Sequence, residues 1–250
     1  MSLPRRPLAS LALLVLVTSP VVAQQGPPDS LVNVQVIPRD TPVQQVIDQM
    51  AGFTRALGVR CTHYHVGSEG MSIWEYDFVS DEKPAKRKAR EMMRMVQAIN
   101  GEYLTRLADL DAEGLDVTCM TCHRGVRLPQ PLADILLRAH ADGGIAGMDS
   151  AYAALRTRYY GQAAYDFSEL TLDRVGEVLL RRGPRADALH AYQRNVELFG
   201  TSAFVRRQLA AAQLEVGDTT AAIAAYRDAL AVNPRDRQSR RALEALGATP

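Results

Sequence analysis

Two cysteines and a histidine lie within five residues of one another in the segment CMTCH, which runs from Cys119 to His123. On one helical turn, this spacing lets both thiols form thioether bonds to the vinyl groups of haem while the histidine ligates the iron. A zinc half-site and a redox disulfide are rival uses of Cys119 and Cys122. Zinc needs further ligands that a chain with three cysteines supplies poorly, and a redox pair follows a strand in a βαβ context that this sequence lacks. The spacing therefore predicts a covalently attached haem c.

A second segment, CTHYH from Cys61 to His65, has the histidine but carries Tyr64 where the second cysteine would stand. If Cys119 and Cys122 serve one site, Cys61 is left over. A leftover thiol in an exported chain needs an explanation. The question is whether CTHYH holds a second haem through a single thioether or is no haem site at all.

Two predicted helices must position these segments. Asp40-Thr41-Pro42 supplies an N-cap and a first-turn proline for the first helix, and Gly58 ends it. Ser80-Asp81 and Pro84 open a second, long helix whose early basic run is typical of a solvated face or, less simply, a docking patch for an acidic partner. The apolar faces at helical spacing are Val43, Val46, Ile47, Met50, Phe53 and Leu57 in the first helix, and Met92, Met95, Val96, Ile99, Tyr103, Leu107 and Leu110 in the second.

Three stretches carry a family resemblance: MAGFTRALGVRCTHYH, MMRMVQAINGEYL and GLDVTCMTCHRG. Together they resemble the last two haem segments of the multihaem cytochrome subunit of photosynthetic reaction centres, over roughly residues 42–130. The resemblance implies a helix with an axial methionine, a turn, and then a helix with the attachment segment. It therefore implies that Met50 and His65 ligate the first iron, and that Cys61 attaches this haem through a single thioether. Only Tyr64 departs from the pattern.

The second haem has His123 as its proximal ligand, and its distal ligand stays open. Met95 is the first candidate, and Met92 lies one turn away. The corresponding haem of the reaction-centre subunit takes a histidine from a distant segment that this short chain lacks, so His63 and His140 are also kept as candidates.

Both ends of the chain carry further signals. Residues 1–23 combine Arg5 and Arg6, an apolar run and Val-Val-Ala, which is typical of a cleaved secretory signal peptide. We therefore expect a periplasmic or extracellular protein whose mature chain has no integral membrane span. An extended arm, residues 24–41, follows, and its apolar part from Leu31 to Ile37 suggests docking on a second copy of the chain. The near-neutral charge argues against nucleic acid as a partner.

The last third contains a repeat with a period of 34 residues, seen in the pairs Leu170 and Phe204, Gly183 and Gly217, Ala188 and Ala222, and Tyr192 and Tyr226. This period resembles the tetratricopeptide repeat. The predicted fold is therefore mainly α: a dihaem cytochrome c domain at 42–130, a helical connector at 131–165, and a tetratricopeptide-like repeat array with a capping helix at 166–250. Such arrays bind peptides or proteins, or serve only to support the neighbouring domain.

If both irons have two axial ligands, no open position remains for a substrate. The sequence thus favours single-electron transfer between redox proteins, without enzymatic activity, and the family resemblance alone does not imply photosynthesis. Two alternatives remain. One is a repeat-based interaction protein with a single structural haem. The other is a peroxide-reactive haem enzyme in which the iron opposite His123 lacks a ligand.

Overall fold

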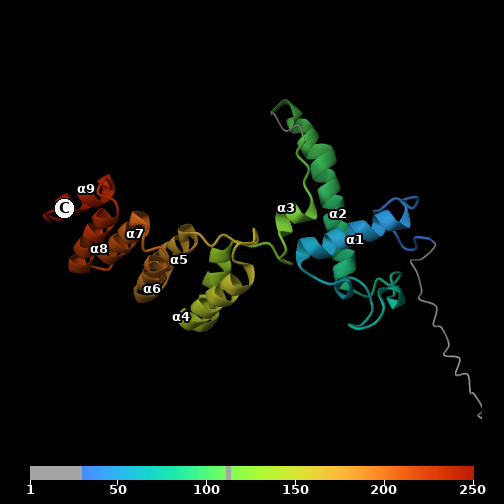
Figure 1. Cartoon of the computed structure of the whole chain (residues 1–250), viewed down its shortest axis with the longest axis horizontal. Helices are drawn as coiled ribbons and strands as arrows, with labels where there is room; N and C mark the ends of the chain where they lie inside the picture. Colours follow the sequence, from blue (N-terminus) through green and yellow to red (C-terminus); the bar gives the residue numbers. More distant parts are fainter. Residues whose placement is uncertain (1–29, 111–113) are drawn as a thin grey trace, which may run out of the picture.

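The computed structural model describes residues 30–110 and 114–250, so the predicted signal peptide and residues 24–29 of the arm lie outside the described residues. The described chain is mainly helical, as predicted, and elongated, with α1–α3 toward one end and α7–α9 toward the other (Figure 1). Its β-structure is a single isolated bridge between Val66 and Asp77 within these residues. The elements are α1 (Val43–Leu57), η1 (Cys61–His63), η2 (Ile73–Glu75), α2 (Pro84–Ala98), η3 (Ile99–Tyr103), η4 (Leu104–Leu110), α3 (Cys119–His123), α4 (Leu132–Tyr159), α5 (Glu169–Arg182), α6 (Arg185–Leu198), α7 (Ala203–Glu215), α8 (Thr219–Val232) and α9 (Arg237–Ala245).

The first predicted helix is α1, and Gly58 ends it in the left-handed conformation, with φ of 64°. Its predicted N-cap is wrong, because Pro42 precedes the helix and no side chain caps it. The reason is local: the Thr41 N–H donates to the carbonyl of Pro38, so Asp40 and Thr41 belong to a separate turn.

The long second helix begins at Pro84 as expected, but it is not uniform. The α-helix α2 ends at Ala98, and the chain continues through a π-helical turn, η3, and then a 3-10 segment, η4. A π-turn widens the helix by one residue and turns the side chains that follow. Several apolar side chains along this stretch are exposed: Met92, Met95, Tyr103 and Leu107.

Helices α1 and α3 pack against each other at their C-terminal ends. The Gly125 N–H, just after α3, donates to the carbonyl of Ala56 at 2.8 Å. A Cβ built at Gly58 would lie 2.2 Å from the Gly125 carbonyl oxygen. This close approach of two backbones links the segment that follows α1, CTHYH, to the end of CMTCH.

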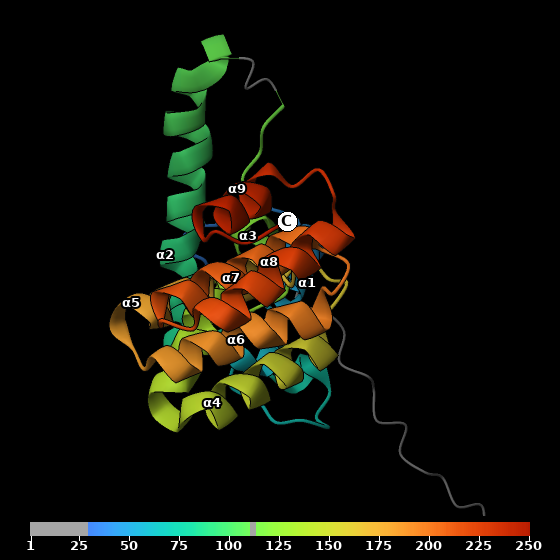
Figure 2. The same cartoon turned by 90° about the vertical axis from the view of Figure 1, so that its left-hand side faces the viewer.

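The C-terminal half is a stack of helices in chain order, in which α4 contacts α5, α5 contacts α6, α6 contacts α7 and α7 contacts α8 (Figure 2). Non-helical dihedral angles at Gly143 and Gly144 divide α4 into two stretches. Helices α5 and α7 begin 34 residues apart, as do α6 and α8. The structure therefore contains two helical hairpins in the predicted register, while their membership of the tetratricopeptide family stays a prediction.

Helix α4 shares its core with the first hairpin. Leu132, Leu136 and Met148 of α4 belong to the same buried cluster as Leu172 and Val175 of α5. The predicted connector thus packs as an extra layer of the repeat array.

Candidate haem sites

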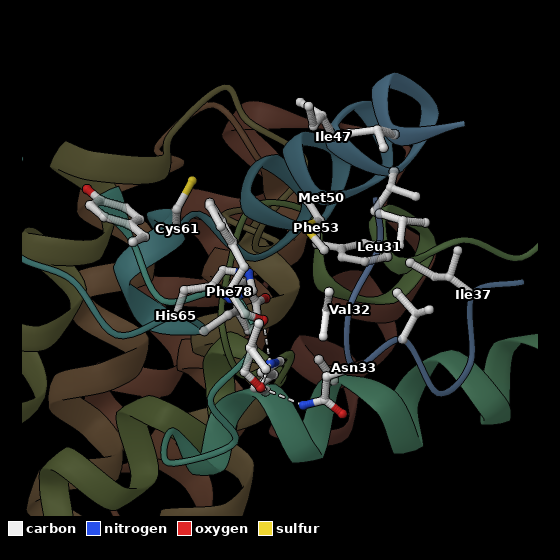
Figure 3. A pocket seen from close by; sticks show the side chains of 18 of the residues that line it. Leu31, Val32, Asn33, Ile37, Ile47, Met50, Phe53, Cys61, His65 and Phe78 are labelled. Atoms are coloured by element: carbon white, nitrogen blue, oxygen red, sulfur yellow. Dashed lines mark hydrogen bonds between the residues drawn. The ribbon is translucent and has the colours of Figure 1, made fainter. Parts of the chain in front are cut away.

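Residues Met50, Cys61 and His65, predicted to serve one site, line a single cavity of about 580 Å³. Pockets that hold cofactors typically measure about 300–1,000 Å³ and are mainly apolar. Met50 and Phe53 come from α1, Cys61 and His65 come from the CTHYH segment, and Leu31 and Val32 come from the arm (Figure 3). The loop before α2 contributes its three aromatic residues: Trp74, Tyr76 and Phe78.

His65 is 6% exposed, and its buried Nδ1 has no hydrogen-bond partner among the described residues. Its ring packs edge-on against Phe78, with 4.8 Å between the ring centres. Burial, helped by the charge of Lys86 and opposed by Asp77, lowers the pKa of His65 to about 4. The imidazole is therefore neutral at physiological pH, which is the form that ligates a metal. The ring is therefore held by packing, and an imidazole nitrogen remains available to bind a metal.

Tyr64 also lines this cavity and is 8% exposed. Burial, with a smaller contribution from Cys119, raises the pKa of its phenol to about 12. The side chain that replaces the second cysteine is thus a neutral, buried wall of the cavity and offers no thiol. At most one thioether, from Cys61, is available here.

The CMTCH segment forms the short helix α3. The Thr118 side chain accepts a hydrogen bond from the Thr121 N–H at its start, and Arg124 ends it in the left-handed conformation. Cys119 and Cys122 lie on this one turn and form no disulfide. Within residues 30–110 and 114–250, no three His, Cys, Asp or Glu side chains form a group that could hold a metal ion.

His123 makes the hydrogen bond expected of an oriented metal ligand. Its Nδ1 lies 3.0 Å from the carbonyl oxygen of Val126. Because a carbonyl only accepts, Nδ1 must carry the hydrogen, which leaves the Nε2 lone pair free to bind a metal. Such a bond to the second ring nitrogen fixes the orientation of ligating histidines. The donor set Cys119, Cys122 and His123 thus fits haem c.

The candidates for the distal ligand of the second haem lie in different places. Met92 and Met95 are 43% and 44% exposed on α2. His63 lies in η1, with its ring 4.8 Å from that of Tyr64. His140 lies on α4, and its Nε2 is 2.7 Å from a carboxylate oxygen of Asp187. This bond already occupies a nitrogen of His140, whereas the two methionines are open to a neighbouring group.

Two residues of these sites were missed by the sequence analysis. Met93 lines the first cavity beside Met50, although it flanks the predicted apolar face of its helix. Asn100, in the π-turn η3, fastens the chain just before α3: its amide donates to the Val117 carbonyl at 2.8 Å and accepts from the Val117 N–H at 2.9 Å. The π-turn that orients Asn100 has no reliable sequence signal.

The basic run at the start of α2 is largely engaged within the molecule. Lys83 donates to the carbonyl of Thr62, and Lys86 donates to the carbonyls of Phe78 and Ser80. Arg90 pairs with Asp81 at 2.9 Å. These side chains connect α2 to the CTHYH segment and to the loop before α2. Their role is thus mainly internal, and differs from both the solvated face and the docking patch suggested by the sequence.

Comparisons with known proteins find similarity over part of the chain. Residues 19–141 match the family model of the photosynthetic reaction centre cytochrome C subunit. Cytochrome c-554 of Chloroflexus aurantiacus is 35% identical over 100 residues, which are 40% of this chain and 21% of that protein. The chain therefore spans about a fifth of the length of this relative. The chain is thus similar to c-type cytochromes of the reaction-centre type, and these matches support haem c as its cofactor.

Proposed function

We propose that this c-type cytochrome is exported, carries two haems, and transfers single electrons between protein partners. The observation that carries the proposal is the cavity at which Met50, Cys61 and His65 converge, since these are the residues that a haem with one thioether and two axial ligands requires. The CMTCH helix, with Nε2 of His123 free, supports the second haem.

Each site has its own set of residues. Cys61 would attach the first haem, with His65 and Met50 as axial ligands. Cys119 and Cys122 would attach the second, with His123 as the proximal ligand and Met95 as the proposed distal one. Met92 stays an alternative, as do His63 and His140. When bound, each haem supplies a one-electron redox centre whose potential depends on its ligands and on the apolarity of its surroundings.

The residues around the first cavity favour electron transfer over catalysis. A histidine and a methionine at one site would fill both axial positions, so no position is left for a substrate. The apolar and aromatic walls of the cavity, together with methionine ligation, would raise the redox potential of a haem bound there. We therefore propose that the protein is not an enzyme.

Partners and location complete the proposal. Redox proteins would act as electron donor and acceptor, and the helical hairpins of the C-terminal half would offer a docking surface for a protein or peptide. The proposed location is periplasmic or extracellular. No helix in the described part of the chain is long and apolar enough to cross a membrane.

The haem count tests this function. Intact mass under denaturing conditions gives the number of covalent haems, and pyridine haemochrome absorbance gives total haem per chain. We expect two by both measures. One covalent haem with a total of two would mean that the Cys61 site holds haem by ligation alone. One by both measures would contradict the dihaem proposal and favour the repeat-based interaction protein.

Carbon monoxide tests the absence of enzymatic activity. If both irons have two axial ligands, the reduced native protein does not bind carbon monoxide. Rapid binding at one site, together with turnover of peroxide, would favour the peroxide-reactive alternative.

A further inference from the structure

The arm has a place in this structure that the sequence analysis did not foresee. Residues Ser30–Ile37 all line the cavity that contains Met50, Cys61 and His65. This segment has no helix or strand of its own. Its side chains Leu31, Val34 and Val36 are partly buried at the cavity, whereas Val32 is 59% exposed. An irregular segment keeps such a position only when other contacts offset the conformational entropy that it loses.

Those contacts form a latch, made of Asn33, Asp81, Lys86 and Arg90. The Asn33 amide donates to the Val79 carbonyl at 2.6 Å and to a carboxylate oxygen of Asp81 at 3.0 Å. In return, Arg90 donates to the Asn33 carbonyl at 3.1 Å. Asn33 has a φ of 58°, a left-handed conformation that asparagine adopts more readily than most residues.

The two cations of the latch are largely buried, whereas Asp81, with which both pair, is 35% exposed. The side chains of Lys86 and Arg90 are each 11% exposed, and both pair with Asp81, at 3.2 and 2.9 Å. Charge-assisted hydrogen bonds such as these are roughly twice as strong as neutral ones. Lys86 and Arg90 also line the cavity, so the latch joins the arm directly to the cavity wall.

The two haem sites differ in what holds them together. The CMTCH site has two thiols, and its candidate distal ligands Met92 and Met95 are exposed on α2. The CTHYH site has one thiol, with Tyr64 in the second position, and it is the site that the arm covers. The arm thus covers the site that has one thiol fewer for attaching haem.

Resting on the proposed function, we infer that the arm is a strap that retains the haem of the Cys61 site and keeps it ligated, in place of the thioether that Tyr64 cannot form. Leu31, Val34 and Val36 supply apolar contacts, and Asn33 is the positioning residue that fastens them. The arm therefore acts on its own chain, and docking on a second copy becomes an outcome that the test distinguishes.

The test uses the full chain with two changes in the strap. The triple change Leu31→Ser, Val34→Ser and Val36→Ser removes its apolar contacts. Asn33→Gly removes the amide while allowing the positive φ. Val232→Ser is the control, because it makes the same chemical change at an exposed residue of α8 that does not line the cavity. Haem per chain, carbon monoxide binding by the reduced protein and size by light scattering are measured for each.

We expect haem per chain to fall from two toward one in the triple variant, or the remaining haem to bind carbon monoxide. Asn33→Gly should show a smaller effect in the same direction, and Val232→Ser should match the parent. Adding Tyr64→Cys to the triple variant should restore two haems, because a second thioether replaces the strap. The CMTCH haem, unchanged throughout, confirms that the variants fold.

Other outcomes overturn the inference. A triple variant with two haems and no carbon monoxide binding means that the strap is not needed. If that variant also has a smaller particle size in light scattering than the parent, the arm docks on a second copy. A parent protein with one haem contradicts the dihaem function itself, whereas a parent with two and an unaffected triple variant contradicts only the strap.

Discussion

At the scale of single residues, Met50 is the most specific part of the proposal. Met50 and Met93 both line the first cavity, and sequence reasoning selected only Met50. We predict that Met50→Leu removes the distal ligand, so that the reduced protein binds carbon monoxide and the potential of that haem falls. Met93→Leu, an equal change in the same cavity, should leave both properties unchanged. The reverse pattern in potentiometric titration and carbon monoxide binding would assign the ligand to Met93.

Asn100 carries the second prediction at this scale. Its side chain satisfies both backbone groups of Val117 and donates to Asp116 at 2.7 Å, immediately before the CMTCH helix. Asn100→Ala leaves these partly buried groups without partners and should lower the free energy of unfolding by about 1–3 kcal/mol. Gln97→Ala, at an exposed position of α2, is the control and should change it by less than about 0.5 kcal/mol. Equal urea midpoints for the two variants would show that the Asn100 side chain does not stabilise the fold.

At the scale of elements, the contact between α1 and α3 depends on Gly58. An alanine there would have to adopt a left-handed conformation, at a cost of about 1–2 kcal/mol, and its Cβ would meet the Gly125 carbonyl at 2.2 Å. The clash involves backbone atoms of Gly125, so no side chain can move to relieve it. We therefore expect Gly58→Ala to separate α1 from α3 and to reduce the amount of haem bound. Gly52→Ala is a matched control, because a Cβ there meets nothing within 4 Å. That change should stabilise α1 by about 0.5–1 kcal/mol. Thermal unfolding of both variants distinguishes the two effects.

Because the latch contains Asp81, the attachment of the arm should depend on pH. The hydrogen bond from Arg90 is the largest cause of a strongly lowered pKa of Asp81, with Asn33 and Lys86 adding to it. A carboxyl whose pKa is lower in the folded state stabilises that state above its unfolded pKa of about 3.9 and loses this effect as the pH falls below it. We predict that proteases cleave the arm faster below about pH 4. In the Asp81→Asn variant the arm should be cleaved fast at every pH. If the rate of cleavage in the parent does not change with pH, the prediction is wrong.

At the scale of the whole molecule, periodicity and short segments predicted most of the architecture. The end of α1 at Gly58, the start of α2 at Pro84 and the 34-residue register all appear in the structure. The sequence could not reveal the π-turn at Asn100 or the arm over the first cavity. Both depend on contacts between residues far apart in the chain, such as Asn33 with Asp81, for which local pattern gives no signal.

The division of the chain into folding units is the remaining prediction. Leu132 and Leu136 of α4 are buried in one cluster with α5 and α6, and the second hairpin packs on the first. A short array of repeats needs such an added layer, because each hairpin alone leaves an apolar face uncovered. We therefore predict that a fragment of residues 131–250 folds without haem, with a helical circular dichroism spectrum and a single cooperative urea transition. A fragment of residues 166–250, which lacks α4, exposes the face that Leu136 and Met148 cover and should be clearly less stable. Equal stability of the two fragments would mean that the connector at 131–165 does not stabilise the repeat array and is a separate element.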